Sequence, residues 1–517
     1  MKTGLLKNKS SQSLPDYDVI IAGAGPVGLF LACELALARC KVLILEKTEN
    51  AQSVLKQLPF GMRGLSAPTI ESLYRRGLLG ELQIHKKMKR PHAGTASAQE
   101  AAQGRQLGHF AGIPFYENYI DTATWKHRIA VSTDTSLLSS MEEIETVLGR
   151  RATDLGVDIR RGLAITGFHQ NADGVTVESD DRFFQSKWLV GCDGSRSMVR
   201  RAGGFEFSGT EPEFTGYTLL VDIADPEKLK PGRNVTAEGM YLQSQPGYLI
   251  VQDFDAGAFH SSEKPLRLEQ VQEVVRRVSN TGVTINALHM GTTWTDRARQ
   301  ATTYRKGRVI LAGDAAHIHA PLGGQGLNLG MGDAMNLGWK LAATIHEEAP
   351  SGLLDSYFTE RYPVGAEVLD WSRAQVAIMG SSPASKALYA IMQDLMNTTD
   401  GATYFAGRVW GIHTRYHLGI EHALAGRSVP DFTLADGAKL GDVMHDGRGI
   451  LLDFDLNEAF KDLLRGYEGQ IKYIAGRAND QLGISAMLIR PDGIVAWASD
   501  KVADYAELRQ AMLRWFG

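Results

Sequence analysis

The first hydrophobic pattern in the chain consists of two short β-branched runs on either side of a run rich in Ala and Leu. Residues 17–22 and 41–45 have the composition of buried strands, and residues 26–38 have that of a helix. Two parallel strands need a crossover of about a dozen residues, which the intervening helix supplies. The pattern therefore predicts a βαβ unit, with Glu46 directly after its second strand.

A second pattern of buried strand followed by helix lies far downstream. Residues 309–312 predict a buried strand, and from Leu327 onward apolar residues recur at helical spacing. Between the two patterns the chain becomes rich in strands. Residues 216–222 alternate, and residues 239–243 with 248–253 predict a hairpin that turns at Pro246 and Gly247.

Length and composition limit the class of protein. A chain of 517 residues exceeds one ordinary core and predicts two or three domains. Its 44% hydrophobic and 22% charged residues are typical of a soluble globular protein, and a net charge of -4 argues against nucleic acid as a partner. The cysteines show neither a CxxC pair nor metal-ligand spacing, so we expect no metal site and a reducing, cytoplasmic location.

The apolar run near the N-terminus, residues 19–38, is long enough to imitate a signal anchor. Gly23, Gly25, Pro26 and Gly28 interrupt it, and a strand followed by a helix explains its apolarity without lipid. We therefore expect no membrane insertion. Residues 1–15 are polar and rich in small residues, which predicts a disordered tail.

The turn after the first strand carries the pattern G-x-G-x-x-G. Its first glycine permits a tight turn, its second lets the backbone approach a pyrophosphate, and its third lets helix and strand pack closely. Glu46 follows at about the expected 20 residues and is placed to accept hydrogen bonds from ribose hydroxyls, which favours FAD or NAD over NADP. A glycine turn in an ordinary α/β domain is the alternative. The predicted contacts of this half are Gly23, Gly25, Pro26, Val27, Gly28, Glu46 and Lys47.

The second glycine-rich segment favours FAD over NAD. Asp314 follows a buried strand, where its carboxylate can accept hydrogen bonds from a polyol, and a rigid proline and a glycine-rich turn then precede the helix. A helix N-terminus offers unpaired N–H groups and positive potential to electron-rich ligand atoms. FAD can span both motifs, with its adenine and ribose near Glu46 and its ribityl chain and flavin ring near Asp314. The alternative for Asp314 is an ordinary aspartate in a turn. The predicted contacts here are Gly313, Asp314, Pro321, Gly324, Gly326, Leu327 and Asn328.

A third motif, Asp193-Gly194, follows a predicted strand over residues 187–190 and is by itself equally typical of a turn with a helix cap. With the three motifs in this order, the chain resembles the FAD-dependent aromatic hydroxylases, the single-component flavoprotein monooxygenases of the phenol and polyketide hydroxylase type. The match continues through residues 333–341 and 354–361 and covers most of the chain up to about residue 374.

The resemblance implies an α/β fold in which a Rossmann-like FAD-binding domain, of the glutathione-reductase type, carries an inserted β-sheet substrate domain. A C-terminal thioredoxin-like domain without CxxC follows, with a role in packing or in contact within a homodimer. The implied boundaries are residues 16–85, 125–204 and 301–380 for the FAD-binding domain, 86–124 and 205–300 for the substrate-binding domain, 381–425 for a helical linker and 426–517 for the thioredoxin-like domain.

The resemblance also implies the reaction. NADPH or NADH would reduce FAD, O2 would add to give a flavin C4a-hydroperoxide, and a phenolic or polycyclic, polyketide-like aromatic small molecule would take the distal oxygen atom. That chemistry requires positive potential at the first turn of the helix, a wall at Pro321 and an apolar lid against water. Baeyer–Villiger oxidation, epoxidation or antibiotic inactivation by the same cofactor is the alternative, as is a non-catalytic flavin or ligand binder.

Further site residues follow from the resemblance. Asp193 joins the predicted cofactor contacts, Arg63 is the nearest candidate for a basic residue on the flavin side, and Ile165 is similar to a strand position whose backbone meets adenine. No catalytic base is identifiable. Arg63, His317 and His319 are the candidates closest to the flavin in sequence; His260 and His289 are candidates by type only, and a structural role is the alternative for every histidine.

Aromatic residues of the β-rich region are the candidates for stacking on a flat substrate. Most of them are expected in the core, and the sequence does not show which one or two contact substrate. The candidates are Tyr217, Tyr241, Tyr248 and Trp294.

Overall fold

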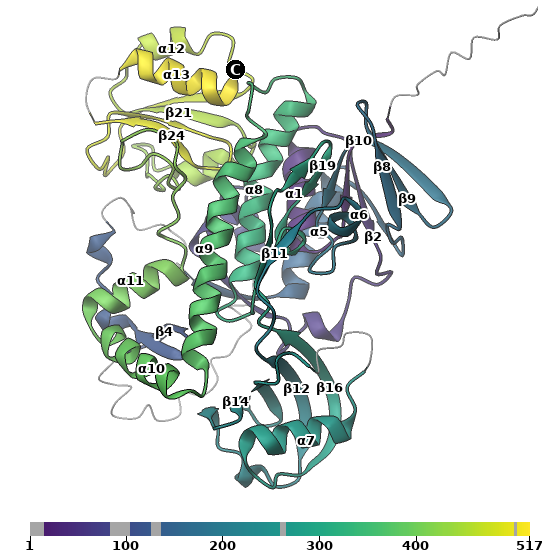
Figure 1. Ribbon diagram of the computed structural model, residues 1–517. Coiled ribbons are helices and arrows are strands. Elements are labelled where there is room, and N and C mark those ends of the chain that lie inside the picture. Colours follow the sequence, from purple (N-terminus) through teal and green to yellow (C-terminus); the bar gives the residue numbers. More distant parts are fainter. Residues whose placement is uncertain (1–14, 83–103, 126–135, 259–264, 501–503) are drawn as a thin grey trace, which may run out of the picture.

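Residues 15–82, 104–125, 136–258, 265–500 and 504–517 are described by the computed structural model. Residues 1–14 of the predicted tail and the candidate His260 lie outside them. Figure 1 shows a lobe formed by the C-terminal residues at the top, a β-sheet lobe at the bottom and a larger α/β part between them.

An eight-stranded sheet organises the α/β part. The Val, Ile and Leu side chains of its central strands β19, β10, β1 and β2 have almost no solvent exposure, as the near-continuous apolar runs predict. Five strands run parallel, in the order β19 (Val309–Leu311), β10 (Arg182–Gly191), β1 (Tyr17–Ala22), β2 (Val42–Glu46) and β7 (Asp158–Arg161). The remaining strands pair antiparallel: β18 (Arg305–Lys306), β9 (Val175–Ser179) and β8 (Gly167–Gln170).

The predicted βαβ unit is confirmed. The helix α1 (Pro26–Leu37) connects β1 to β2 and ends one residue before the predicted end. It packs against α5 (Met141–Asp154) and α8 (Gln325–Ile345). The helix α8 begins two residues before the predicted Leu327, because Gln325 and Gly326 continue the helix without being apolar. Among the described residues, no helix is long and apolar enough to cross a membrane.

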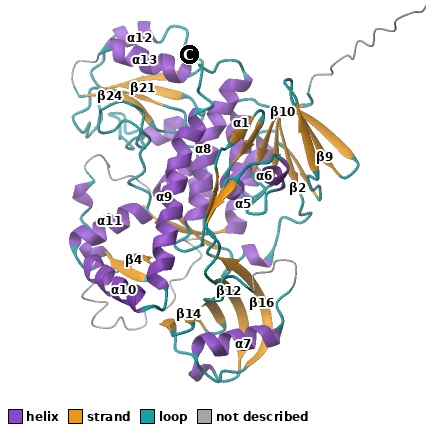
Figure 2. Ribbon diagram, viewed as in Figure 1, coloured by secondary structure: helices purple, strands orange, loops and turns teal. Residues whose placement is uncertain are grey.

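A separate five-stranded antiparallel sheet forms the lower lobe (Figure 2). Its order is β13 (Gly232–Val235), β14 (Gly239–Gln245), β15 (Tyr248–Asp253), β12 (Thr215–Ile223) and β16 (Ile285–Thr295). The predicted hairpin is confirmed as β14 and β15, with Gly247 at φ 76° in its turn. The helix α7 (Leu268–Ser279) covers one face of the sheet through a stripe of valines at helical spacing, Val271, Val274, Val275 and Val278.

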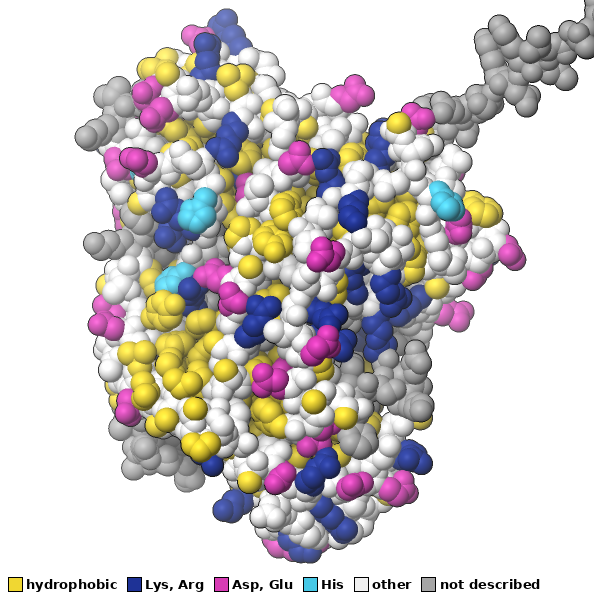
Figure 3. All heavy atoms as spheres, in the orientation of Figure 1, with side chains coloured by type: hydrophobic (Ala, Val, Ile, Leu, Met, Phe, Trp, Pro, Cys, Tyr) yellow, Lys and Arg dark blue, Asp and Glu magenta, His cyan; other side chains and the backbone are white. Residues whose placement is uncertain are grey.

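A helical segment lies beside the lower lobe. It consists of the end of α9 (Ser356–Met379), α10 (Pro383–Met396) and α11 (Thr399–Val409), which pack around the hairpin of β4 (Gln106–Phe110) and β5 (Ile113–Tyr116). The hairpin reaches the five-stranded sheet through the side chain of Met240, not through strand pairing in the described residues. On the face seen in Figure 3, hydrophobic side chains gather at the lower left; α10 exposes Leu388, Ile391 and Leu395.

The upper lobe is a four-stranded sheet, in the order β22 (Ile471–Ala475), β21 (Gly449–Asp453), β23 (Ala486–Ile489) and β24 (Val495–Ser499). β21 and β22 are parallel, and the other pairs are antiparallel. The helix α12 (Ala459–Leu463) lies between β21 and β22 in sequence, and α13 (Tyr505–Phe516) ends the chain. Trp339 of α8 packs against Trp515 and Phe516 of α13, so the lobe shares a hydrophobic core with the α/β part.

Buried ion pairs join the same two parts. The Arg490 side chain, with 0% exposure, donates to both carboxylate oxygens of Glu360 at 2.7 and 2.9 Å and also pairs with Asp492. Lys340 donates to Glu360 at 2.8 Å. Arg76 pairs with Glu34 at 2.7 Å and donates to the carbonyl oxygen of Pro491 at 2.9 Å. Removing one member of such a pair would leave a buried charge without compensation.

Candidate cofactor and substrate site

The ends of three strands bring the sequence motifs together. β1, β10 and β19 are adjacent and parallel, and in register Ala22 lies beside Gly191, and Gly191 lies beside Leu311. Because the carboxyl ends of parallel strands meet at one edge of a sheet, the turns that follow these strands are neighbours. The glycine fingerprint, the Asp193 turn and the Gly313-Asp314 turn therefore border one site.

The fingerprint turn leaves no space for side chains where the motif has its outer glycines. Gly23 has φ 101°, and a Cβ there would lie 2.5 Å from the carbonyl oxygen of Cys192. A Cβ at Gly28 would lie 2.1 Å from the carbonyl oxygen of Gly23. A Cβ at Gly25 would meet nothing within 4 Å, so the backbone there is open to an approaching ligand. Helix α1 begins directly after it, with Pro26 at its first position.

Glu46 lies at the end of β2 with its carboxylate turned back to the fingerprint. Its Oε2 accepts a hydrogen bond from the N–H of Ala24 at 2.8 Å, and its Oε1 accepts one from Thr48 at 2.8 Å. Burial alone would raise the pKa of Glu46, but these two N–H donors hold it below its ordinary value. The group is therefore an ionised acceptor at neutral pH, as a ribose contact requires.

The structure shows the capping role of Asp193, and its contact with the cofactor stays a prediction. Its Oδ2 accepts hydrogen bonds from the N–H groups of Met198 and Val199 at 2.7 and 3.1 Å, which caps the short helix α6 (Met198–Ala202). Its Oδ1 is buried without a hydrogen-bond partner in the described part of the chain. One oxygen thus serves the fold, and the other is left for a ligand.

The turn after β19 is held from behind by Asp333 of α8. Asp333 has 0% exposure and accepts hydrogen bonds from the N–H of Gly313 at 3.0 Å, from His317 Nε2 at 2.7 Å and from Arg361 Nε at 2.8 Å. Burial alone would raise the pKa of Asp333, but His317 and Arg361 hold it below its ordinary value. Asp333 therefore fixes the backbone at the position where Asp314 leaves the sheet.

Asp314 itself points away from this network. Its side chain reaches solvent and makes no hydrogen bond to a described residue, although protein surrounds it on the other sides. This loss of surrounding water raises the pKa of the Asp314 carboxyl, while His317 and Arg63 oppose the shift. An acceptor that is positioned by its backbone and has no protein partner is suited to a polyol ligand.

The first turn of α8 lies beside Asp314. A Cβ at Gly326 would lie 3.5 Å from His319 Nε2 and 3.9 Å from Asp314 Oδ1, so only glycine leaves this side of the turn uncovered. The cap residue Gly324 has φ 68°, a conformation that favours glycine. Because the helix starts at Gln325, the unpaired N–H groups are those of Gly324, Gln325, Gly326 and Leu327.

The side chain of Asn328 has a structural role, and its contact with the flavin stays a prediction. Its Nδ2 donates to the carbonyl oxygen of the cap residue Gly324 at 2.9 Å. The same side chain joins α8 to β3 (Met62–Ser66): Nδ2 donates to Gly64 O at 2.8 Å, and Oδ1 accepts from Ser66 N at 2.8 Å. Asn328 thus positions a neighbouring strand beside the site.

Arg63 of β3 lies in this neighbourhood. It is half-buried and donates to the carbonyl oxygens of Phe60 and Met62 at 3.1 and 2.7 Å. Burial lowers the pKa of its guanidinium, with the nearby groups of Tyr248 and Asp314 opposing the shift. Phe60 contacts Tyr248 edge-on at 5.5 Å between ring centroids. The structure therefore brings Arg63, Asp314 and Tyr248 to the same region.

The histidine candidates separate by position. His317 has 1% exposure and pairs with Asp333, which is a structural role. His319 Nδ1 donates to the Ala320 carbonyl oxygen at 2.7 Å, so Nδ1 carries the proton, and the buried Nε2 has no hydrogen-bond partner among the described residues. Burial lowers the pKa of His319 to about 4. His289 is half-exposed in β16 and pairs with Asp222 at 3.0 Å, which removes it from the site.

Four buried polar atoms without a hydrogen-bond partner among the described residues belong to the segments around this edge. Native proteins pair nearly all such atoms, so a group of them indicates a polar ligand. These segments also carry the fingerprint's open Gly25 backbone and the unpaired N–H groups of α8. The donor and acceptor set fits a long polar cofactor with FAD's sugar, pyrophosphate and ring. The atoms are Asp193 Oδ1, His317 Nδ1, His319 Nε2 and Gln325 Oε1.

The five-stranded sheet separates the aromatic candidates by face. Tyr217 and Tyr241 have 2% and 4% exposure in the cluster beneath α7, so we remove them from the substrate candidates. Side chains alternate between the two faces along each strand, and Tyr248 and Trp294 lie at positions that face away from α7. On that face, Trp294 Nε1 donates to Thr218 at 3.3 Å. The face opposite α7 is the one that Arg63 and Phe60 approach.

The remaining predicted contacts lie at the rim. Ile165 lies in the segment between β7 and β8 and not in a strand, so the strand placement is wrong, because this segment connects the parallel to the antiparallel part of the sheet. Its backbone contact with adenine stays a prediction. Lys47 is exposed directly after Glu46, and Pro321 is exposed just before α8. Val27 contacts the opposite motif, because a Cβ at Gly313 would lie 3.1 Å from its Cγ2.

Sequence reasoning missed the role of Asp333. The signal was available, since an acidic residue interrupts an otherwise apolar helical stripe. A buried carboxylate of this kind needs several donors. Its partners Gly313, His317 and Arg361 lie on three other segments, so the pairing itself became visible only in the fold.

Comparison with known proteins agrees with this geometry. A family model described as an FAD binding domain matches residues 16–372, and one described as the C-terminal part of the aromatic-ring hydroxylases matches residues 422–517. The fold is thus that of a flavin monooxygenase. The chain belongs to the FAD-dependent aromatic hydroxylases.

Relatives match along nearly the whole chain. A protein of Claviceps purpurea named as a monooxygenase is 43% identical, covering 96% of this chain and 97% of its own. A rifampicin monooxygenase of Streptomyces venezuelae is 36% identical, covering 97% and 99%. The structure of the OxyS anhydrotetracycline hydroxylase of Streptomyces rimosus superposes with a TM-score of 0.82 at 34% identity, covering 97% of this chain and 99% of that one.

Proposed function

We propose that the protein uses NADPH or NADH and O2 to hydroxylate a phenolic or polycyclic, polyketide-like aromatic small molecule. The observation that carries the proposal is the convergence of three motifs at one sheet edge, next to a sheet face that bears Tyr248 and Trp294. Bound FAD would supply the redox chemistry, accepting electrons from the nucleotide and activating O2. The protein's part is to bind, orient and shield.

Each half of the site supports one part of that task. The ionised Glu46 accepts hydrogen bonds from a ribose, and the uncovered Gly25 backbone allows a pyrophosphate to approach. Asp314 accepts from a polyol chain. The unpaired N–H groups of Gln325 and Gly326 place positive potential where a reduced flavin ring carries negative charge.

The residues around the proposed reacting face limit water and proton donors. Pro321 has no N–H, so it walls the face without offering a proton. Phe60 and Tyr248 form an edge-on pair next to Arg63 and close this side with aromatic surface. Exclusion of water would preserve a reactive oxygen species long enough for transfer to an aromatic ring.

The size of the substrate is supported by the relatives. One is named for rifampicin and another for anhydrotetracycline, and both align with this chain over nearly its whole length. The rifampicin name also favours a second candidate, oxidation that inactivates an aromatic antibiotic. Baeyer–Villiger oxidation and epoxidation use the same binding site, and product analysis separates them from hydroxylation.

The C-terminal lobe supports a thioredoxin-like fold. A parallel pair, β21 and β22, connects through α12, and two antiparallel strands and α13 follow. No Cys lies in this part of the sequence, so a redox role is excluded on composition. We assign it to packing through Arg490 and Trp515, and contact in a homodimer stays a prediction.

The test is direct. Purified protein is loaded with FAD, and NADPH and NADH oxidation is followed with a panel of phenols, naphthols, anthraquinones, tetracyclines and rifamycins. We expect one class to stimulate oxidation and to gain the mass of one oxygen atom. If FAD stays oxidised with both nucleotides and every aromatic compound, the proposed function is wrong.

A further inference from the structure

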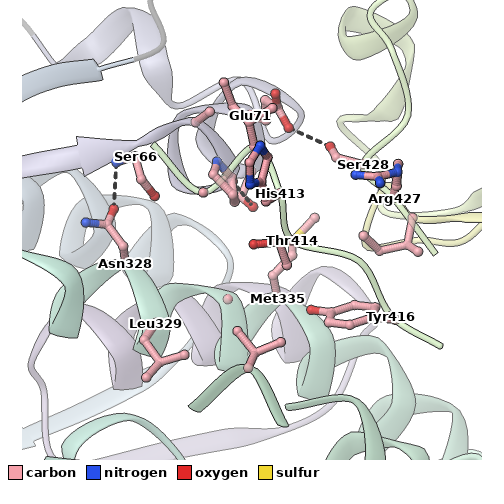
Figure 4. A pocket seen from close by; sticks show the side chains of 18 of the residues that line it. Ser66, Glu71, Asn328, Leu329, Met335, His413, Thr414, Tyr416, Arg427 and Ser428 are labelled. Atoms are coloured by element: carbon pink, nitrogen blue, oxygen red, sulfur yellow. Dashed lines mark hydrogen bonds between the residues drawn. The ribbon is translucent and has the colours of Figure 1, made fainter. Parts of the chain in front are cut away.

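A cavity of 490 Å³ lies beside the first turn of α8. Its walls come from three parts of the chain: the start of α2 (Ala67–Tyr74), the helices α8 and α9, and the C-terminal lobe with the segment that leads into it (Figure 4). Its volume lies within the range of small-molecule sites. The aromatic candidates of the five-stranded sheet do not line it, so it is separate from the proposed substrate face.

One side of this cavity is apolar and aromatic. Trp371 and Trp125 line it, and Trp371 is held in place by Phe110 and Phe405 at 4.4 and 5.5 Å between ring centroids. Aliphatic side chains of α8 and α9 extend the same wall. They are Leu329, Met335, Val364 and Val368.

The cavity also carries positive charge that protein carboxylates do not neutralise fully. Arg408 pairs with Glu367, but Arg427 donates only from Nε to the Ala423 carbonyl oxygen at 3.2 Å and has no ion pair among the described residues. Burial, followed by the charge of Arg415, lowers the pKa of Arg427. An anion at Arg427 would relieve both effects.

The cavity also contacts the proposed flavin site. Gln325 lines it and is the first residue of α8, and its buried Oε1 has no hydrogen-bond partner in the described residues. Asn328 lines it too, while its side chain holds β3 beside the flavin region. The cavity and the proposed flavin site therefore share the first turn of α8.

We infer that this cavity binds the nicotinamide dinucleotide donor, with a phosphate group at Arg427 and an aromatic base against the wall that contains Trp371. The inference rests on the proposed function, which requires such a donor. A dinucleotide combines flat aromatic rings with several negative charges, and the cavity offers both an aromatic wall and a guanidinium, that of Arg427, without an ion pair among the described residues. The C-terminal lobe then contributes to donor binding as well as to packing.

The main experiment reverses the charge of Arg427 in the FAD-loaded protein. Arg427→Glu should raise the KM for NADPH and the Kd for NADP+, measured by titration, by roughly tenfold or more, since a charge-assisted contact is lost. FAD content and kcat at saturating NADPH should stay within about twofold. Arg509→Glu, which makes the same change at an exposed site on α13 outside the cavity, should leave all four quantities unchanged.

A second variant fills the cavity and keeps its charge. Thr414→Trp adds a large side chain at a lining position, and it should weaken NADP+ binding while FAD binding persists. If Arg427→Glu does not fold, Thr414→Trp alone tests whether NADP+ binds in this cavity. Wild-type NADP+ affinity in a folded Thr414→Trp variant, or in a folded Arg427→Glu variant, overturns the inference.

The outcomes distinguish failure of the proposed function from failure of the proposed donor site. If wild-type protein never oxidises NADPH or NADH but loses NADP+ binding on Arg427→Glu, the proposed function fails and the site stands. If it oxidises NADPH and neither variant changes the KM, the site fails and the function stands. A further titration uses 2-naphthoate with the wild-type protein and both variants. If Arg427→Glu and Thr414→Trp weaken the binding of 2-naphthoate but not that of NADP+, the cavity binds an aromatic acid and the donor assignment is overturned.

Discussion

Asp314 and Asp333 border the same turn but differ in every contact. Asp333 is buried and satisfied by three protein donors, whereas Asp314 reaches solvent and makes no hydrogen bond to a described residue. A buried, satisfied carboxylate contributes to the fold, and an unpartnered one at a ligand edge contributes to binding. The two positions therefore predict different consequences of substitution.

Replacing Asp314 should remove FAD and spare the fold. Asp314→Ala deletes an acceptor for the polyol chain, which at about 1.5–3 kcal/mol for a charged hydrogen bond weakens FAD binding by about 10- to 150-fold. Flavin absorbance per mole of protein measures occupancy, and the thermal midpoint of the FAD-free protein measures the fold. Asp181→Ala, at an exposed turn, is the matched control. Unchanged flavin content in Asp314→Ala would contradict the assigned role.

The pKa of His319 gives a prediction about acid stability. It lies at about 4 in the folded state, below the ordinary 6.5, so the unfolded chain binds the proton more readily. The contribution of the neutral ring is thus complete above about pH 6.5 and is lost as the pH falls toward 4. His319→Gln cannot charge, so its thermal midpoint should fall less than that of wild type between pH 7 and pH 5. An equal fall in both proteins would show that His319 titrates normally.

The residues at this edge were partly predictable. The glycines and Glu46 carry a pattern whose physical reasons lie within some 25 residues of sequence. Arg63 and Tyr248 carry no such local pattern. They belong to two different strands, β3 and β15, and no spacing in the sequence relates them to Asp314. Tyr217 and Tyr248 were indistinguishable by residue type, and the face of the sheet that each occupies decided between them.

At the scale of elements, the two α/β patterns were predicted to within one or two residues. The parallel strands are apolar throughout and the helix α1 has a proline at its start, so both ends carry signals. The start of α8 was missed because Gln325 and Gly326 are neither apolar nor strong helix formers. The helical segment from α10 to α11 and its contact with β4 and β5 carried no local signal of their packing.

The close packing of α1 on α8 yields a stability prediction with opposite signs at two glycines. A Cβ at Gly338 would lie 2.4 Å from the Cβ of Glu34, whereas one at Gly149 of α5 meets nothing within 4 Å. Gly338→Ala should therefore destabilise the protein by about 1–3 kcal/mol through overpacking. Gly149→Ala should stabilise it by about 0.5–1 kcal/mol through its lower chain entropy. Urea unfolding midpoints compare the two, and a stabilised Gly338→Ala would show that α1 and α8 can separate.

At the scale of the molecule, buried ion pairs join the C-terminal lobe to the rest. Arg490→Met should destabilise the chain by about 3–5 kcal/mol, because it removes the only arginine that pairs with Asp492 in the described residues and leaves Glu360 with Lys340 as its one cation. Arg448→Met, which removes an exposed pair with Asp446, should cost at most about 1 kcal/mol. Calorimetry should show one transition that moves as a whole in Arg490→Met. A separate early transition would mean that the lobe unfolds independently.

These contacts also set an order of events during synthesis. Arg76 donates a hydrogen bond to the carbonyl oxygen of Pro491, which lies 415 positions later in the chain. At about 5–20 residues per second, the ribosome needs on the order of 20–80 s to supply that acceptor. Until then the arginine stays hydrated or paired with Glu34, and the surface of α8 that the C-terminal lobe covers, including Trp339, stays exposed. The βαβ unit can form early, but the finished enzyme waits for its final strands.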